Sequence, residues 1–397
     1  MISVSEAEKL IFQIKLTLKT ELVPLSDAIG RVLAEDVSAD RPFPPFDRVA
    51  MDGITVGEGS FQEGDRFEVK GIQAAGAPTT ELTAQAMEVM TGAILPVGGG
   101  SVIPYEHLSW EETEGCRVAI LQQPCKAGQN IHRKGSDRPK GDLLIAAGRK
   151  ISSPEIATLA TVGKAEVRVQ ARPKVAIVST GDELVEVAAM PLPHQIRKSN
   201  SPMLVARLAE LGIEAQAYHL NDDRELLKDG LEKLMQQYEV LLFTGGVSMG
   251  KFDFVPEVLD AVGVRKSFHK VKQRPGKPFW FGAWDSGVVF ALPGNPVSSF
   301  FCFERYFIPW FYQQQGRDFR PLRVRLSSEV VFKPALTRFL EVSVRQTAEG
   351  IFEAAPRKGG GSGDLAKLNE VDGFIELPAA ETTFHEGTFF DFYGFRQ

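Results

Sequence analysis

Four segments between residues 179 and 299 combine glycine with acidic or amide side chains, and each follows an apolar run. They are "STGDELV" at 179–185, "LNDDRE" at 220–225, "TGGVSMGKFDF" at 244–254 and "LPGNPVSS" at 292–299. Glycine lets a ligand approach the backbone closely, and carboxylate oxygens are ligands that Mg²⁺ prefers. The combination predicts a site that holds an anion together with a hard metal ion.

A basic segment, "FHKVKQRPGKPFWFG" at 268–282, lies between the third and fourth of these segments. It carries Lys270, Lys272, Arg274 and Lys277 around a Pro-Gly turn. Cations beside exposed backbone N–H groups suit a phosphate or another oxyanion. Together with the carboxylates they predict metal-assisted chemistry at a phosphate bond. The chain contains no G-x-x-x-x-G-K-[ST] element, which disfavours an ordinary P-loop NTPase.

Each segment alone also has a purely structural interpretation. Asp182 or Asp223 can cap the helix that follows, Gly245 and Gly246 can serve a tight turn, and the lysines can lie on a solvated face. The functional interpretation is favoured because all four segments follow strands of one predicted sheet. In an open parallel α/β sheet, ligands bind at the carboxyl ends of the strands.

Several elements are needed to position these segments. From residue 172 onward, apolar strands such as "PKVAIVST" and "EVLLFTGG" alternate with helical runs such as "SPMLVARLAELG", which predicts a doubly wound parallel sheet. Upstream, the spacing predicts helices at 5–19, 26–37 and 152–162, the last with Ser153 as its N-cap. A β-rich block separates the second from the third. After residue 321, short alternating strands predict a small all-β terminal domain.

Composition narrows the class of protein. A chain of 397 residues with 43% hydrophobic and 24% charged residues is typical of a globular protein with about two to four domains. The net charge of -6 argues against a nucleic-acid partner. Three widely spaced cysteines and six histidines without metal-ligand spacing predict neither disulfides nor a zinc site. No apolar run reaches the ~18 residues of a membrane span, and the N-terminus lacks signal-peptide character, so a cytoplasmic location without membrane contact is expected.

The motifs resemble those of a known family. "TGDEL", "TGGVSMGKFDF", "RPGKPF" and "LPGNPVSSF", in this order, are similar to the molybdopterin molybdenumtransferase family, which includes MoeA and the gephyrin E-domain. The resemblance extends to "SDAIGRVLAEDV", "AMDG" at 50–53, "MTGAILP", "GQNIHRKGSD" and "SPEIATLATVG". It covers nearly the whole chain and is weakest in the terminal β domain.

The resemblance implies a fold, a reaction and partners. The expected fold is multidomain α/β plus β: an elongated helical domain I (1–44 and 138–170), an inserted β-rich domain II (45–137), a molybdopterin-binding doubly wound α/β domain III (171–318) and a β-barrel-like domain IV (319–397). The implied reaction inserts molybdate into adenylyl-molybdopterin and releases AMP with Mg²⁺. The implied assembly is a homodimer with its active-site cleft between subunits, with transient contacts to the molybdopterin adenylyltransferase and molybdoenzymes.

The resemblance also implies roles for individual residues. The implied catalytic set is Asp52, Asp137, Glu183, Asp222 or Asp223, Asp253, Lys270 and Arg274, and Mg²⁺ is expected on Glu183, Asp222 and Asp253. The implied pterin and phosphate contacts are Thr180, Gly181, Gly245, Gly246, Ser248, Pro275, Gly276, Lys277, Pro293, Gly294, Asn295 and Ser298. Arg274 departs from the family, which usually has lysine there. Arginine keeps the charge and adds a two-donor grip on an oxyanion.

Two alternative functions remain open from the sequence. A non-catalytic pterin-binding scaffold can use the same fold, because fold does not fix function. The several carboxylates beside an anion site argue against it, since they weaken anion binding unless a metal is needed. The second alternative is a molybdopterin adenylyltransferase, which resembles only residues 172–312; the flanking motifs favour the insertion step.

Overall fold

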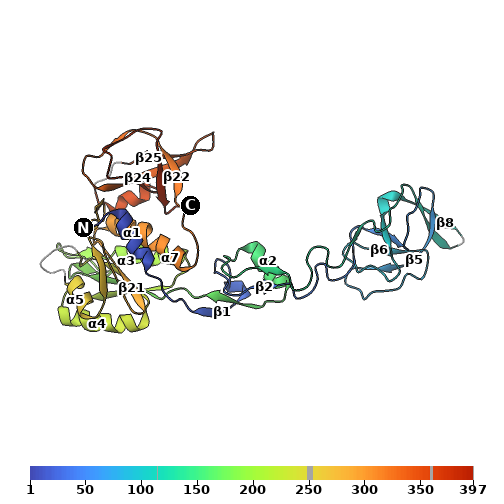
Figure 1. Ribbon diagram of the computed structural model, residues 1–397, viewed down its shortest axis with the longest axis horizontal. Coiled ribbons are helices and arrows are strands. Elements are labelled where there is room, and N and C mark those ends of the chain that lie inside the picture. Colours follow the sequence, from blue (N-terminus) through green and yellow to red (C-terminus); the bar gives the residue numbers. More distant parts are fainter. Residues whose placement is uncertain (114, 248–253, 358–360, 397) are drawn as a thin grey trace. The chain divides into compact units, whose positions relative to one another are not determined.

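The computed structural model describes residues 1–113, 115–247, 254–357 and 361–396. The chain forms two compact units (Figure 1). The first comprises Met1–Glu21 and Gln170–Gln397, and the second comprises Leu22–Val169. The predicted site segments at 179–299 all fall in the first unit.

A six-stranded sheet forms the centre of the first unit. Its strand order is β16-β13-β17-β21-β20-β18. The bounds are β13 (Val175–Thr180), β16 (Ala215–Leu220), β17 (Val240–Thr244), β18 (Arg265–His269), β20 (Trp280–Trp284) and β21 (Gly287–Leu292). The first four strands in that order are parallel, which confirms the prediction for them. Only β20 runs in the opposite direction, antiparallel to both of its neighbours, β21 and β18. Its link to β21 consists of Asp285 and Ser286 alone, and so short a turn cannot form a crossover.

Helices cover both faces of this sheet, as predicted for a doubly wound fold. Side chains alternate along β13: Val175 and Ile177 pack with α3 (Asn200–Glu210), and Ala176 and Val178 pack with α4 (Arg224–Gln237) and α5 (Val255–Ala261). Figure 1 shows α4 and α5 on the side of the sheet opposite α1 and α3. The alternation follows from the period of two along a strand. It explains why both faces of β13 are apolar.

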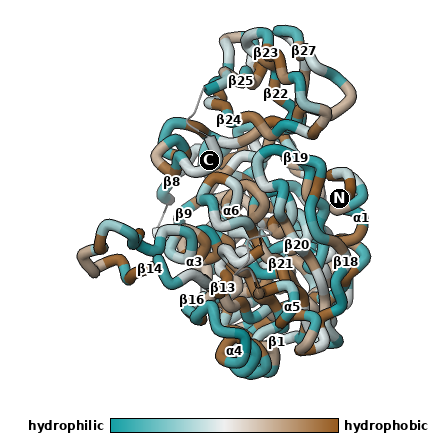
Figure 2. The backbone as a smooth tube through the Cα atoms, turned by 90° about the vertical axis from the view of Figure 1, so that its left-hand side faces the viewer, coloured by the Kyte–Doolittle hydropathy of each residue, from teal (hydrophilic) through white to brown (hydrophobic). Residues whose placement is uncertain are grey.

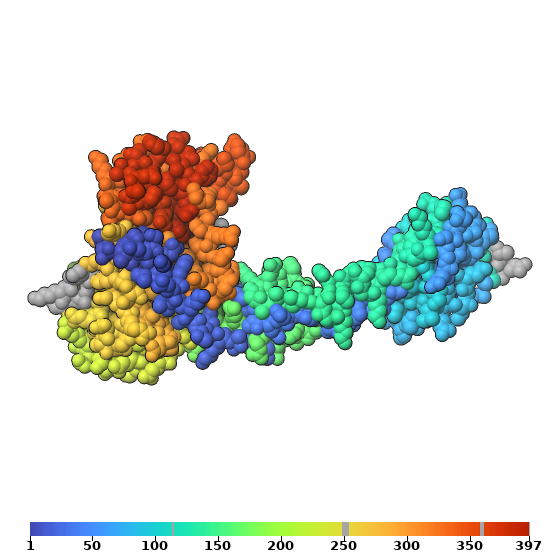
Figure 3. Space-filling model, in the orientation of Figure 1, coloured from blue at the N-terminus to red at the C-terminus, as the bar shows by residue number. Residues whose placement is uncertain are grey.

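The first helix belongs to this unit rather than to the second. α1 (Val4–Gln13) buries Val4, Ala7 and Ile11 in the same core as α3, and the Trp310 indole N–H donates to the Ile14 carbonyl at 3.0 Å. In Figure 3 the blue N-terminal segment lies against the yellow and orange segments of the first unit. The apolar face of α1 thus finds its partners in the α/β core.

A long, bent helical segment follows the fourth site segment. It consists of α6 (Pro296–Cys302), a π-helical turn (Phe303–Phe307) and α7 (Ile308–Gln314). A short strand, β19 (Gln273–Arg274), carries the basic segment to the next domain, where it pairs with β24 in parallel. Another pair, β14 (Leu184–Val185) and β15 (Ile196–Arg197), forms a projection that carries apolar residues (Figure 2).

The C-terminal strands close into a barrel, as the family resemblance implies. The strands are β22 (Leu322–Leu326), β24 (Thr337–Gln346), β25 (Phe352–Pro356), β26 (Gly373–Leu377) and β28 (Phe389–Gly394). β24 pairs with both β25 and β26, so the order β24-β25-β22-β28-β26 returns to its start. β23 (Val330–Val331) pairs with β27 (Thr383–Phe384) outside the closed order, and a 3-10 helix spans Leu365–Glu370.

The second unit contains a six-stranded sheet and three short ladders. The sheet has the order β7-β4-β6-β5-β9-β8, from β4 (Gly53–Val56), β5 (Arg66–Gln73), β6 (Ala86–Val89), β7 (Ser101–Pro104), β8 (Leu108–Thr113) and β9 (Cys116–Leu121). The ladders pair β1 (Thr20–Pro24) with β12 (Glu166–Gln170), β2 (Val37–Ser38) with β11 (Leu143–Ile145), and β3 (Arg48–Val49) with β10 (Ile131–His132). In each ladder, a strand that precedes the six-stranded sheet in the sequence pairs with a strand that follows it. The domain boundaries expected from the sequence stay a prediction.

Two local expectations for this unit are wrong. The predicted helix at 26–37 is only a 3-10 turn at Leu25–Asp27, because Val32 and Leu33 form β-bridges to Lys150 and Val169 instead. The predicted helix at 152–162 is present as α2 (Ser153–Thr161), but its N-cap is Ser152, which forms a capping box with Glu155. Within the described ranges, no helix is both long and apolar enough to cross a membrane.

Candidate functional site: two adjoining cavities in the first unit

The first cavity, of 560 Å³, opens at the carboxyl ends of the parallel strands. All four predicted segments contribute to its wall. The predicted residues that line it are Thr180, Gly181, Glu183, Asp222, Gly245, Gly246, Pro293, Gly294 and Asn295. The parallel register explains this, since Thr180 lies opposite Leu220 and Thr244 opposite Leu292, so the four chain segments leave the sheet side by side.

The fold itself requires glycine at Gly245 and Gly246, independently of any ligand. Gly246 has φ +69, and a Cβ atom there would lie 2.5 Å from Val255 Cγ2 and 2.8 Å from Thr180 Oγ1. Gly245 has φ +128, and its nearest neighbour would be the Thr180 carbonyl oxygen at 3.5 Å. Gly246 therefore lets the loop pack tightly on β13 and α5, whereas Gly245 faces more open space beside the cavity.

The start of α3 also lines the first cavity, although none of its residues was predicted there. Lys198, Ser199, Asn200 and Ser201 contribute to the wall. The Asn200 amide donates from Nδ2 to the Gly294 carbonyl at 2.7 Å, while its buried Oδ1 has no partner. An unsatisfied buried acceptor favours a ligand that brings a donor. The N–H groups at a helix N-terminus favour an anion. Lys198 and Asn200, just before the helical run that starts at Ser201, could have indicated these cavity residues from the sequence.

The second cavity, of 530 Å³, adjoins the first. The two share Pro278 and the loop Pro293, Gly294 and Asn295 in their walls. The predicted residues Arg274, Pro275, Gly276, Lys277 and Ser298 line the second cavity only, so the structure separates the basic segment from the carboxylates. The barrel adds Arg338 and Glu341. Neither was predicted, because they lie in the terminal domain, where the sequence motifs are weakest.

Two arginines lie side by side at this second cavity. Arg274 on β19 is the register partner of Arg338 on β24. Burial lowers the pKa of the Arg338 guanidinium; Glu341, 3.5 Å away, opposes that shift, and Arg274 adds to it. Like charges on adjacent strands repel each other unless an anion neutralises them. Three cations around one carboxylate thus make a cavity suited to a multiply charged oxyanion.

The carboxylates of the first cavity fit a magnesium ion. Glu183 and Asp222 both line it, and they supply the hard oxygen ligands that Mg²⁺ takes beside substrate phosphate oxygens. In the part of the chain that the structure describes, no three His, Cys, Asp or Glu side chains gather as a ready metal site. Asp253, the third expected ligand, lies outside the described residues, as does Ser248.

Other predicted residues lie elsewhere. Asp223 caps α4, accepting hydrogen bonds from the backbone N–H groups of Glu225 and Leu226 at 3.0 Å, which is the structural interpretation considered for it. Lys270 has φ +73 and is not among the residues lining either cavity. Its backbone N–H donates to the Phe279 carbonyl.

Asp52 and Asp137 belong to the second unit. A hydrogen bond of 2.6 Å from the Thr91 backbone N–H lowers the pKa of Asp52. Asp137 Oδ1 lies 2.7 Å from His132 Nε2. Both carboxylates are exposed on their own unit and are held by local partners. Their expected role in catalysis stays a prediction.

Comparisons with known proteins cover the whole chain. Residues 2–163 match the MoeA N-terminal region (domain I and II), residues 176–313 a probable molybdopterin binding domain, and residues 323–395 the MoeA C-terminal region (domain IV). A molybdopterin molybdenumtransferase of Synechocystis sp. is 37% identical, covering 99% of this chain and 100% of its own. The one from Bacillus subtilis is 31% identical over 97% of this chain and 92% of its own.

Solved structures agree with the sequence relatives. The crystal structure of a molybdopterin biosynthesis MoeA protein from Pyrococcus horikoshii superimposes with a TM-score of 0.84 at 29% identity, over 100% of both chains. The three matching regions, the full-length relatives and this structural agreement all lead to one family. The chain belongs to the molybdopterin molybdenumtransferase (MoeA) family.

Proposed function

We propose that this protein is the molybdenum insertase of molybdenum cofactor biosynthesis, inserting molybdate into adenylyl-molybdopterin with Mg²⁺-dependent release of AMP. The observation that carries the proposal is the pair of adjoining cavities. One contains carboxylates and a helix N-terminus, the other contains three cations, and they share the loop Pro293–Asn295. A reaction that joins an adenylylated pterin to a separate oxyanion needs two such compartments in contact.

The first cavity takes the pterin and its pyrophosphate. The N–H groups at the start of α3 favour the phosphate oxygens, and Asn200 Oδ1 accepts a hydrogen bond from a pterin N–H group. Glu183 and Asp222 would hold Mg²⁺. When bound, that ion neutralises charge on the pyrophosphate oxygens and makes AMP a better leaving group.

The second cavity takes molybdate. Arg274 and Arg338 each offer paired N–H donors, Lys277 adds a point charge, and Ser298 lines the same cavity with a short hydroxyl side chain. Three positive charges against the single carboxylate of Glu341 leave a net attraction for a dianion. The cations also fix molybdate beside the shared loop, so that it meets the pterin in a limited range of orientations.

Asp222 and Asp223 provide a matched test of this proposal. Asp222 lines the first cavity, whereas Asp223 caps α4. Asn keeps the cap nearly as well as Asp, so Asp223→Asn should retain molybdate-dependent AMP release. Asp222→Asn should lower its rate by about 10²-fold or more, because a carboxylate that would hold the charge-neutralising Mg²⁺ is lost. Equal activity of the two variants would remove Asp222 from the mechanism.

We further propose that the protein is a cytoplasmic homodimer whose active site includes Asp52 and Asp137, and that it contacts the molybdopterin adenylyltransferase and molybdoenzymes transiently. Support comes from the family to which the chain belongs. A non-catalytic scaffold would bind the adenylylated pterin without AMP release, and an adenylyltransferase would consume ATP, so the same assay separates both alternatives from the insertase.

A further inference from the structure

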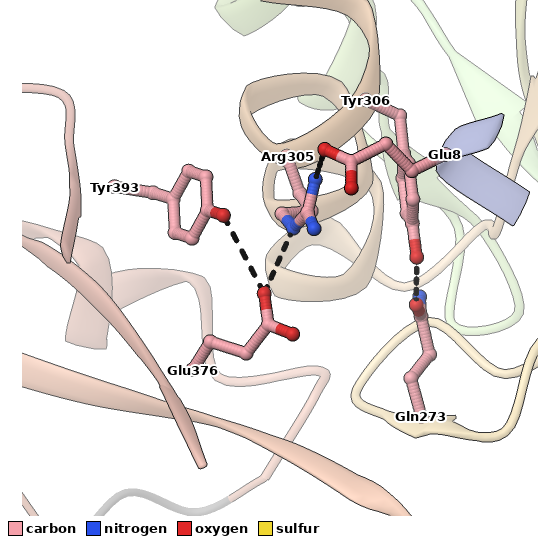
Figure 4. Close-up of polar contacts among 6 residues, drawn as sticks. All are labelled: Glu8, Gln273, Arg305, Tyr306, Glu376 and Tyr393. Atoms are coloured by element: carbon pink, nitrogen blue, oxygen red, sulfur yellow. Dashed lines mark hydrogen bonds and ion pairs between the residues drawn. The ribbon is translucent and has the colours of Figure 1, made fainter. Parts of the chain in front are cut away.

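The second cavity rests on a buried polar contact that no step of the proposed chemistry uses. Gln273 is fully buried directly before Arg274, and both ends of its amide are occupied. Its Oε1 accepts a short hydrogen bond from the Tyr306 hydroxyl (Figure 4). Its Nε2 donates to the Gly276 carbonyl at 3.1 Å and lies 3.4 Å from Cys302 Sγ. A fully satisfied buried amide holds its surroundings in one arrangement.

This contact closes the cation loop, residues 273–277, which carries Arg274 and Lys277. Gln273 and Gly276 bracket Arg274 and Pro275, and Lys277 follows immediately. Gly276 has φ +84, and a Cβ atom there would lie 2.5 Å from Cys302 Sγ and 2.7 Å from Gln273 Nε2. The loop therefore sits directly on the Gln273 side chain and on α6. A shift of the amide would move the loop.

Tyr306 is itself held firmly. It is buried, and its ring stacks on Phe279 with centroids 4.8 Å apart and planes 25° from parallel. Burial raises the pKa of Tyr306 well above its ordinary value, so the hydroxyl remains protonated and donates. Its position on a π-helical turn is also typical of functional sites.

The neighbours of Tyr306 on that turn tie it to other elements. Arg305 forms ion pairs with Glu8 of α1 at 2.9 Å and with Glu376 of β26 at 3.1 Å (Figure 4). Glu304 pairs with Arg207 of α3 at 2.7 Å. The π turn thus ties three successive side chains to four other parts of the first unit, and the third side chain, Tyr306, contacts Gln273.

We propose that Tyr306 and Gln273 are positioning residues for the oxyanion cavity: their hydrogen bond sets the placement of Arg274 and Lys277 and thereby the affinity for molybdate. The identity of the anion rests on the proposed function. The placement of Arg274 and Lys277 depends on the Tyr306–Gln273–Gly276 contacts alone. Tyr306 lines neither cavity. Gln273 contributes to the wall of the second cavity, but its amide faces the protein interior, where it contacts Tyr306, Gly276 and Cys302.

The variant Tyr306→Phe tests the pair with little change of shape, because the ring and its stacking on Phe279 remain. We expect the KM for molybdate to rise by about tenfold, because Arg274 and Lys277 are no longer held in the arrangement that binds the anion. The kcat and the KM for adenylyl-molybdopterin should stay within about twofold of wild type, because the first cavity is unaffected. Gln273→Met should have the same effect, and the double variant should add little to either single change.

Tyr393→Phe is the matched control. The Tyr393 hydroxyl contacts Glu376 at 3.4 Å in the same network but does not touch the cation loop. It should leave both KM values unchanged. If Tyr306→Phe and Tyr393→Phe lower the melting temperature and alter both KM values alike, the contact is merely structural and the proposal is overturned. An unchanged molybdate KM in Tyr306→Phe also overturns it.

Calorimetric titration of molybdate into the full-length protein separates this inference from the proposed function. If wild type releases no AMP but binds molybdate, weaker binding by Tyr306→Phe supports the positioning role while the insertase function fails. If wild type releases AMP and the two proteins bind molybdate equally, the positioning role fails while the function stands. Wild type that binds no molybdate at all contradicts both.

Discussion

Replacing Gly246 by alanine separates the steric demand of the double-glycine loop from its backbone conformation. Gly246 has φ +69, which an L-residue adopts at a cost of about 1 to 2 kcal/mol. The added methyl group would also lie 2.5 Å from Val255 Cγ2 and 2.8 Å from Thr180 Oγ1. Overpacking of this kind costs roughly 1 to 3 kcal/mol. The free energy of unfolding should therefore fall by about 2 to 5 kcal/mol.

Gly263→Ala is the control for the conformational part. Gly263 follows α5 with φ +88, and a Cβ atom there would meet nothing within 4 Å. This variant should lose only the conformational cost of about 1 to 2 kcal/mol. The difference between the two variants, about 1 to 3 kcal/mol, measures the crowding against Val255 and Thr180.

Urea titration followed by circular dichroism measures both losses, and a double variant checks their origin. Val255 is buried, so Val255→Ala is destabilising alone. It removes the Cγ2 atom that Gly246→Ala would strike. The Gly246→Ala/Val255→Ala protein should thus be more stable than the sum of the single losses predicts, by at least about 0.5 kcal/mol. Equal losses for Gly246→Ala and Gly263→Ala, or strict additivity in the double variant, would refute the reasoning.

Three further outcomes follow from other parts of the molecule. Arg305→Met leaves the carboxylates of Glu8 and Glu376 without their cation, so urea titration should show a loss of about 3 kcal/mol in the free energy of unfolding. Arg305→Lys should recover part of this loss, and a loss below ~1 kcal/mol in Arg305→Met would contradict the ion-pair account. The hydrogen bond from Ser152 lowers the pKa of Glu155 from 4.5 to about 2, so Glu155 stabilises α2 fully above pH 4.5 and loses this effect as the pH falls toward 2. The difference in thermal stability between wild type and Glu155→Gln should shrink over that range, and a constant difference would speak against the capping box. Sedimentation at micromolar concentration should give a dimer; a stable, active monomer would exclude a shared cleft.

The residues of the first cavity could be predicted because parallel strands impose their neighbourhood. Once "PKVAIVST" and "EVLLFTGG" are recognised as adjacent parallel strands, Thr180 and Gly245 must leave the sheet at the same edge. The same rule brings Asp222 and Asn295 there. The pattern of strands and helices alone was therefore enough to predict the residues of the first cavity, without any knowledge of side-chain contacts.

The second cavity could not be assembled in the same way. Arg338 meets Arg274 only because β24 of the barrel pairs in register with β19, and no local pattern encodes a register between distant strands. Adjacent carboxylates posed a similar difficulty. Asp223 caps α4 and Asp222 does not, and the sequence does not show which of the two is the cap. The exact end of a helix is less certain from sequence than the presence of the helix. The position of α1 likewise depends on which distant core accepts its apolar face.

The most direct test of the insertase function is AMP release by the purified wild-type protein supplied with adenylyl-molybdopterin and Mg²⁺, with and without molybdate. AMP release that depends on molybdate, together with formation of the molybdenum cofactor, is the predicted result. Binding of the adenylylated pterin without any AMP release, or AMP release at the same rate in the absence of molybdate, would contradict the assignment of the two cavities to pterin and oxyanion.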